Sequence, residues 1–123
     1  MEKPHERLDA WKVSMELVKG VYVLTGDFPR DERFGLTQQM RRAAVSIPSN
    51  LAEGSGRNHA REYLQFIGIA RGSLAELETQ LQLAIMLGYA PADHSAMRLA
   101  SRTGKLLTGL YKTWCRRISQ AAH

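Results

Sequence analysis

Five cationic side chains in the last quarter of this 123-residue chain are spaced so that they could bind phosphate. They are Arg98, Arg102, Lys105, Lys112 and Arg116. On a helix, steps of four, three, seven and four residues place them along one side, and Gly109 fills the position that the long step skips. A line of cations on one rigid helix could follow a nucleic-acid backbone, since each neutralised phosphate releases counterions. No aromatic residue is interleaved on that side, so stacking of single-stranded bases is not indicated there.

The net charge points to the same part of the chain. The sequence carries +5 at pH 7, and residues 93–123 hold six Lys or Arg against a single Asp. The whole positive excess therefore lies in this segment, which favours an anionic partner such as RNA or DNA. A solvated helix face that only aids solubility is the alternative interpretation.

A second polar set lies among small apolar residues between positions 34 and 57. It comprises Arg41, Arg42, Asn50, Glu53 and Arg57. Pro48 is expected to bend the helix there, and the Asn50 amide or the Ser46 hydroxyl could satisfy backbone groups near the bend. Glu53 is expected to pair with one of the three arginines, because a lone buried charge is costly. In the alternative interpretation, the three arginines form an anion pocket at one end of the bundle or along the channel of a ring of copies.

Catalytic chemistry is not indicated by any motif. The sequence lacks a phosphate loop, a nucleophile elbow, a dinucleotide fingerprint and the inward Glu and Glu-x-x-His pairs of di-metal bundles. The histidines, His5, His59, His94 and His123, do not have metal-ligand spacing. Cys115 is the one cysteine and has no base placed beside it in the sequence. We therefore expect a protein that is not an enzyme and holds no cofactor or metal.

The segments that must position these side chains are helical. Apolar residues recur at steps of three and four over residues of about 6–24, 36–53, 58–87 and 92–119. Gly26, Gly54 and Gly88 end the first three segments, and Pro91 is expected in the first turn of the last. No alternating strand pattern occurs. We predict one all-α domain over residues 1–123, an antiparallel up-down-up-down four-helix bundle.

Two of the predicted helices carry more apolar surface than one bundle core requires. The expected core face of the first helix holds Leu8, Trp11, Met15, Val18 and Tyr22. A second row, away from that face, holds Val13, Leu17, Val21 and Leu24. The fourth helix has a similar flank, made of Leu99, Leu106 and Leu110. We interpret these flanks as subunit contacts of a homo-oligomer, because exposed apolar patches mark interaction sites. The alternative is that they cover neighbouring helices within one protomer.

The N-terminal residues and the overall hydropathy favour a cytoplasmic protein. The first dozen residues lack the apolar core of a signal peptide, and no window approaches the roughly 20 apolar residues of a membrane span. A single cysteine excludes an intrachain disulfide and suits a reducing compartment. We expect no contact with a membrane.

One order of residues is similar to that of a known family. It runs through Phe28-Pro29, Glu32, Phe34-Gly35-Leu36, Gln39, Arg41-Arg42-Ala43-Ala44, Ser46-Ile47-Pro48, Asn50 and Leu51-Ala52-Glu53-Gly54. This order resembles the four-helix bundle proteins linked to intervening sequences in bacterial 23S rRNA genes. Trp11, Arg57, Glu76 and Leu87-Gly88-Tyr89 fit as well, so the resemblance covers about residues 7 to 115.

The resemblance implies a four-helix bundle assembled as a ring, usually a homopentamer. Some relatives, such as the accessory variability protein of diversity-generating retroelements, bind nucleic acid and a reverse transcriptase. The expected function is therefore a non-catalytic, homo-oligomeric bundle that binds RNA or DNA through its basic face. The alternative is a protein-interaction scaffold, or an accessory subunit of a nucleic-acid enzyme such as a reverse transcriptase, with no direct contact to nucleic acid.

Overall fold

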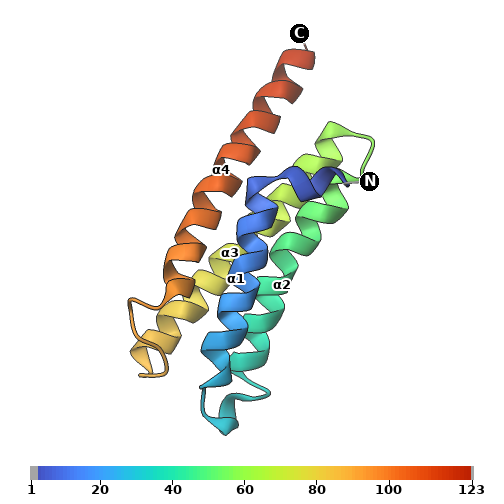
Figure 1. The fold of residues 1–123 in the computed structure, drawn as a ribbon. Coiled ribbons are helices and arrows are strands. Elements are labelled where there is room, and N and C mark those ends of the chain that lie inside the picture. The colour runs from blue at the N-terminus through green and yellow to red at the C-terminus, as the bar shows by residue number, and fades with distance from the viewer. Residues whose placement is uncertain (1–2, 123) are drawn as a thin grey trace.

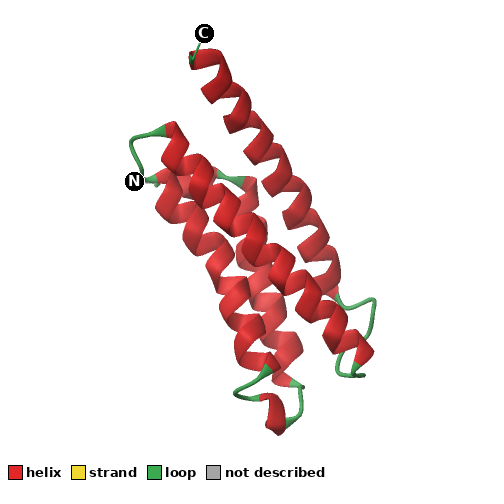
Figure 2. Cartoon of the chain, turned by 180° about the vertical axis from the view of Figure 1, so that it is seen from behind, coloured by secondary structure: helices red, strands yellow, loops and turns green. Residues whose placement is uncertain are grey.

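A computed structural model describes residues 3–122, and four long helices account for most of them (Figures 1 and 2). The helices are α1 (Asp9–Gly26), α2 (Leu36–Ser55), α3 (Ala60–Met86) and α4 (Ser95–Ala121). Two short 3-10 helices, η1 (Pro4–Arg7) and η2 (Arg30–Glu32), precede α1 and α2. None of the helices in the described residues is long and apolar enough to span a membrane.

Successive helices run in opposite directions and form a square bundle (Figure 1). α1 packs on α2, α2 on α3 and α3 on α4, while contacts between α1 and α4 close the square. Within the described residues, no Cα atoms of the diagonal pairs come within 8 Å of each other, and one core lies between the four helices. This arrangement confirms the predicted all-α four-helix bundle.

The starts of the first and last helices differ from the prediction. Leu8 is extended, with φ −75° and ψ 125°, so α1 begins at Asp9 and residues 4–7 form the separate turn η1. Pro91 lies outside α4, contrary to expectation. His94 precedes α4 with ψ 144°, and its Nδ1 accepts a hydrogen bond from the amide of Ala96 at 3.1 Å. α4 therefore begins at Ser95, where a side-chain cap is available.

The core face of α1 is also not the predicted one. Val13, Leu17, Val21 and Leu24, which were expected to contact another subunit, are buried in the core. By contrast, Met15 and Tyr22 remain 46% and 44% exposed. The reason is that α1 contacts two neighbours, α2 and α4, and its buried sector is centred between them. Leu8, Trp11 and Val18 lie at the edge of this sector and are partly buried.

α2 and α3 approach each other closely at Gly54. A Cβ at this position would lie 2.5 Å from the Cβ of Phe66 and 3.0 Å from Cδ1 of Tyr63. These distances are shorter than van der Waals contact, so only glycine lets the two helices approach so closely here. The buried residues of α2 continue the same seam with Ala44, Ile47 and Leu51.

We predict that Gly54→Ala destabilises the protein by roughly 1–3 kcal/mol, because the added methyl group overpacks the α2–α3 seam. The free energy of unfolding from urea denaturation measures the effect. Gly72→Ala is the matched control, since a Cβ at Gly72 in α3 would meet nothing within 4 Å. It should raise stability by up to about 1 kcal/mol through helix propensity. Equal effects of the two substitutions would contradict the close approach at Gly54.

Candidate nucleic-acid interface

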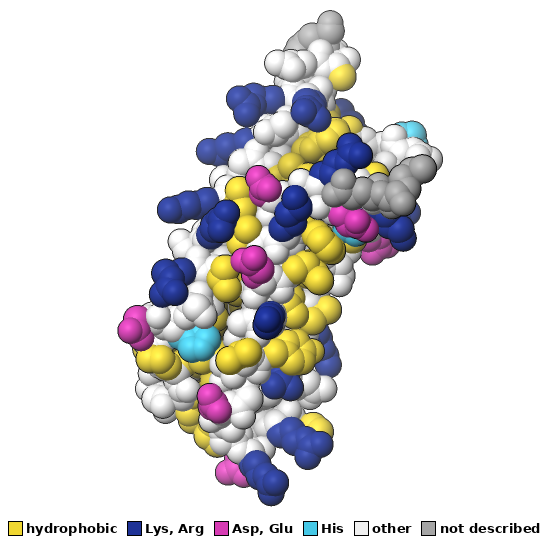
Figure 3. Space-filling model, in the orientation of Figure 1, with side chains coloured by type: hydrophobic (Ala, Val, Ile, Leu, Met, Phe, Trp, Pro, Cys, Tyr) yellow, Lys and Arg dark blue, Asp and Glu magenta, His cyan; other side chains and the backbone are white. Residues whose placement is uncertain are grey.

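The five cations predicted on the fourth helix lie on one exposed side of α4. All five side chains are exposed, and the first and last are 18 residue steps apart on one continuous helix, which is about 27 Å. The core side of α4 carries Ala96, Ala100, Thr103 and Leu107, which are buried. Lys and Arg side chains follow the outer edge of this helix (Figure 3). The structure therefore places the predicted residues together, facing solvent.

Within residues 3–122, these five cations form no ion pair with an acidic side chain. Arg98 donates a hydrogen bond to the backbone carbonyl of Asp93 at 3.3 Å, which leaves its charge uncompensated. The other four make no hydrogen bond to a described residue. A row of unpaired charges creates a positive potential along α4 that attracts anions.

A sixth cation and an aromatic ring join this surface from positions that the sequence did not indicate. Arg71 of α3 lies over the ring of Tyr111, with its Cζ 4.5 Å from the ring centroid. Both line a surface pocket of about 550 Å³ together with Lys112 and Arg116, and Cys115 also lines it. The position of Tyr111 four residues after the buried Leu107 is typical of a core residue. Only the packing of α3 on α4 shows that it is partly exposed beside the cations.

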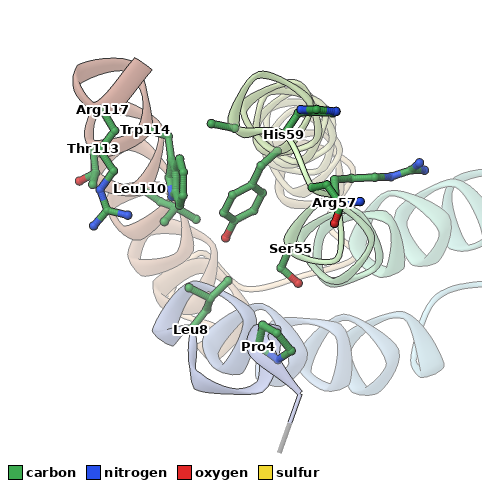
Figure 4. A pocket seen from close by; sticks show the side chains of 12 residues that line it. Pro4, Leu8, Ser55, Arg57, His59, Leu110, Thr113, Trp114 and Arg117 are labelled. Carbon is green, nitrogen blue, oxygen red and sulfur yellow. The ribbon is translucent and has the colours of Figure 1, made fainter. Parts of the chain in front are cut away.

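The C-terminal part of α4 extends past the ends of the other helices (Figure 1). Where this C-terminal part begins, around Leu110 and Trp114, α4 faces η1 and the turn between α2 and α3 across a pocket of about 520 Å³ (Figure 4). Leu8, Leu110 and Trp114 line this pocket, and Trp114 packs edge-on against Tyr63 with ring centroids 4.9 Å apart. Burial raises the pKa of the Tyr63 phenol. The pocket floor is therefore mainly apolar.

The second polar set does not form one pocket. Arg41 belongs to α2, and its side chain reaches the C-terminal end of α1. There its Nε donates to Thr25 Oγ1 at 2.9 Å and its Nη2 donates to the carbonyl of Tyr22 at 3.4 Å. Arg42 is exposed beside it. Arg57 lies at the other end of α2, roughly 20 Å away at 1.5 Å per residue. Within one protomer, the three arginines therefore do not share a pocket at one end of the bundle.

The remaining members of this set have structural contacts. The Asn50 amide donates to the carbonyl of Ser46 at 2.8 Å and to its hydroxyl at 2.9 Å, as predicted for the region of Pro48. The Ser46 hydroxyl also bonds to that of Ser73 in α3 at 2.8 Å. Glu53 pairs with Arg57 at 2.9 Å, and both side chains are about half exposed. Such a surface pair contributes about 0–1 kcal/mol to stability. The expected reason for the pair, a buried charge that needs a partner, therefore does not apply.

Glu32 joins two loops at the opposite end of the bundle from the α2–α3 turn. Its Oε1 accepts from the amide of Leu36 at the start of α2 at 3.3 Å, and its Oε2 accepts from the Tyr89 hydroxyl at 3.0 Å. A Cβ at Gly35 would lie 2.8 Å from Oε1, so glycine leaves room for the carboxylate. Tyr89 also packs on Phe28, with centroids 5.3 Å apart. These residues of the resemblance therefore hold the bundle end together.

The described histidines have separate local roles. His5 packs edge-on against Trp11 with ring centroids 5.0 Å apart, and His94 caps α4. His59 precedes α3 and lines the pocket shown in Figure 4. His123 lies outside the described residues.

The apolar flank of α4 faces α1. Leu99, Leu106 and Leu110 are partly buried and pack against the core of the protomer. Leu99 contacts α1 at Gly20, where a Cβ would lie 3.6 Å from its Cδ1. Part of each side chain stays accessible, so their role as a subunit contact stays a prediction. The largest exposures of apolar side chains are found elsewhere, at Phe34 and Met86.

These features define an all-helical bundle protein with a basic outer edge. The sequence profile described as "23S rRNA-intervening sequence protein" matches residues 6–109. The chain therefore belongs to the 23S rRNA-intervening sequence protein family. Because the match ends at position 109, Lys112 and Arg116 of the basic line lie beyond the matched range.

A solved structure shows the same fold. It is described as a protein with unknown function from the S23 ribosomal protein family of Bacteroides thetaiotaomicron. It is 21% identical to this chain, with a TM-score of 0.75, and the alignment covers 84% of this chain and 98% of that one. No curated protein significantly matches this sequence.

The Glu32–Tyr89 contact predicts a pH dependence of stability. The hydrogen bond to Glu32 raises the pKa of the Tyr89 phenol above its ordinary 10.0, and desolvation and the charges of Glu32 and Asp31 add to the effect. A phenol whose pKa is higher in the folded state stabilises the fold below the unfolded pKa and loses this contribution as pH rises through the folded pKa.

We therefore expect Tyr89→Phe to lower the free energy of unfolding by a constant amount below about pH 10, and by less above it. Urea denaturation at a series of pH values measures this difference. Tyr22→Phe is the control, since the Tyr22 hydroxyl makes no hydrogen bond within residues 3–122. A Tyr89→Phe effect that stays unchanged up to pH 11 would contradict the bond to Glu32.

Proposed function

We propose that this protein is a non-catalytic module that binds RNA or DNA through the outer face of α4. The observation that carries the proposal is the line of five exposed, unpaired cations along about 27 Å of one helix. At 3.4 Å per phosphate of one strand, this length corresponds to roughly eight phosphates. Charged side chains aligned without acidic partners position a phosphate backbone and carry no base preference of their own.

Arg71 extends the proposed surface from α3. Its guanidinium is held over Tyr111, beside Lys112 and Arg116, so the surface is wider near the C-terminal end of α4. Arg is suited to this role because its planar fork of donors matches phosphate geometry. Membership of the 23S rRNA-intervening sequence protein family is consistent with a nucleic-acid partner.

Replacing Arg98, Arg102, Lys105, Lys112 and Arg116 by Gln should weaken binding to duplex RNA or DNA and flatten its salt dependence. If each cation contacts one phosphate, the slope of log K against log salt falls by up to about 4.5, at about 0.9 per phosphate. Fluorescence anisotropy over a salt titration measures both quantities.

The matched control removes the same number of positive charges elsewhere. It replaces Lys3, Lys12, Lys19, Arg30 and Arg61 by Gln, all of which are exposed and lie outside α4. The proposal expects this control to keep most of the salt slope. Equal losses in the two variants would show that only net charge matters and would remove α4 as the binding surface.

We also propose that the chain acts as a homo-oligomer, with a ring of five copies as the favoured assembly. Exposed apolar side chains support self-association, and three of them lie together on the outer side of α3. They are Leu83, Met86 and Leu87. These side chains are exposed in the protomer, so a second copy could bury this edge. A ring would repeat the basic line in every copy and add avidity for a long polymer.

Sedimentation equilibrium should give a mass well above the 13.8 kDa protomer, about 69 kDa for five copies. The double variant Met86→Glu/Leu87→Glu should shift this mass towards the protomer, because it places charges in the contact. Met15→Glu, at an exposed apolar residue of α1, is the control and should leave the mass unchanged. Dissociation by Leu106→Gln alone would assign the contact to the α4 flank and overturn the α3 assignment. A monomeric wild type would overturn self-association itself.

A further inference from the structure

A second basic surface lies on the side of the bundle away from α4. A pocket of about 480 Å³ opens between the C-terminal half of α1 and the N-terminal half of α2. α4 packs on α1 and α3 and does not contact α2, so this pocket is separate from the α4 surface. Its lining comprises Tyr22, Arg33, Phe34, Thr37, Gln38, Arg41, Arg42 and Val45. We call it the α1–α2 pocket.

Three guanidinium groups and no carboxylate line this pocket. Arg41 is held in place by its hydrogen bonds to Thr25 Oγ1 and the Tyr22 carbonyl. These bonds use two of its five N–H donors, so the others stay available. Arg42 forms no ion pair or hydrogen bond with a described residue. The Glu32 carboxylate accepts from Leu36 and Tyr89 and forms no ion pair with these three arginines.

Two aromatic rings accompany these cations. Phe34 is 80% exposed, and the Arg33 guanidinium lies 5.3 Å from its centroid. Tyr22 is partly exposed, with Arg41 at 4.4 Å from its centroid. An exposed phenylalanine contributes little to this fold, since most of its ring remains in water. Interleaved arginines and aromatic rings are the combination that binds unpaired bases and their phosphates.

The start of α2 adds to the positive character of the pocket. Thr37 and Gln38 belong to its first turn, and their amides have no backbone acceptor within the described residues. Amides in a first turn carry the positive end of the helix dipole, which favours anions. The three arginines and the start of α2 therefore both attract a bound anion.

We infer that the α1–α2 pocket binds a single-stranded segment of nucleic acid. One phosphate lies among Arg33, Arg41 and Arg42, and an unpaired base stacks on Phe34. This inference goes beyond the proposed function, because it assigns a different ligand, an unpaired nucleotide, to a surface that α4 does not share. The two surfaces together would hold a junction between a duplex and a single strand.

The test uses a labelled pentathymidine oligonucleotide and an abasic pentamer with the same number of phosphates, measured by fluorescence anisotropy at low salt. Both are added to the full chain that carries the five Gln substitutions in α4, so that the pocket is observed alone. Phe34→Ala should weaken pentathymidine about tenfold and leave the abasic pentamer unchanged. Arg42→Gln should weaken both pentamers several-fold, because it removes a phosphate contact.

Two matched controls isolate the pocket. Ile69→Ala removes an apolar side chain that is also exposed, at 51%, but lies on α3, and Arg30→Gln removes a neighbouring charge that does not line the pocket. Both should bind pentathymidine as the parent does. Thermal unfolding monitored by circular dichroism should show the same fold for Phe34→Ala, given the exposure of its side chain.

Other outcomes would overturn the inference. Unchanged pentathymidine binding by Phe34→Ala, or an equal loss for the abasic pentamer, would exclude base stacking. A pentaglutamate peptide that binds at least as tightly as pentathymidine would identify an acidic protein partner instead. A Phe34→Ala variant with altered mass in sedimentation would identify a contact between copies. If the α4 substitutions leave duplex binding intact while Phe34→Ala loses pentathymidine, the proposed α4 surface fails and the pocket stands.

Discussion

The close packing of α2 on α3 is the contact on which the remaining arrangement depends. At Gly54 the helices approach so closely that a methyl group would overlap Phe66, and small residues such as Ala44 continue the seam along α2. A fixed α2–α3 pair offers two grooves, one for α1 against α2 and one for α4 against α3. α1 and α4 then meet each other, and the apolar sides of all four helices share one core. Because each helix must turn its apolar side to this core, the core fixes the rotation of each helix about its own axis.

The rotation of α4 decides which of its residues reach solvent. Burial of Ala96, Ala100, Thr103 and Leu107 turns the line of cations away from the core. The opposite rotation would bury five charges without partners, at a prohibitive free energy. The basic face is thus a consequence of core packing as well as of the residues that compose it. The C-terminal part of α4 extends past the other helices, and Arg71 and Tyr111 mark where the face is widest.

The residues that carry the family resemblance act mainly at the two ends of the bundle. Glu32 links the α1–α2 and α3–α4 loops through Leu36 and Tyr89, and Gly35 makes room for its carboxylate. At the other end Gly54 sets the α2–α3 distance, and Glu53 pairs with Arg57. These residues make contacts within the fold of this protein. Arg41 has a structural role and a proposed binding role, because it donates to a carbonyl near the end of α1 and also lines the α1–α2 pocket.

The sequence by itself determined the all-helical class, the family and the line of cations on α4. These depend on spacing along one chain, and the helical repeat of about 3.6 residues converts spacing directly into a shared side. The sequence could not determine which side of α1 is buried, because two adjacent apolar rows fit the same repeat. One row is centred on Met15 and the other on Leu17, and contact with both α2 and α4 selects the second.

Only the tertiary structure brought Arg33, Phe34 and Arg42 together with Tyr22, or Arg71 together with Tyr111. It also separated Arg57 from Arg41, although both had been assigned to one polar set. Such groupings depend on distances between helices and on turns between them. Those distances are set by side-chain packing in the core, which spacing along a single helix does not encode.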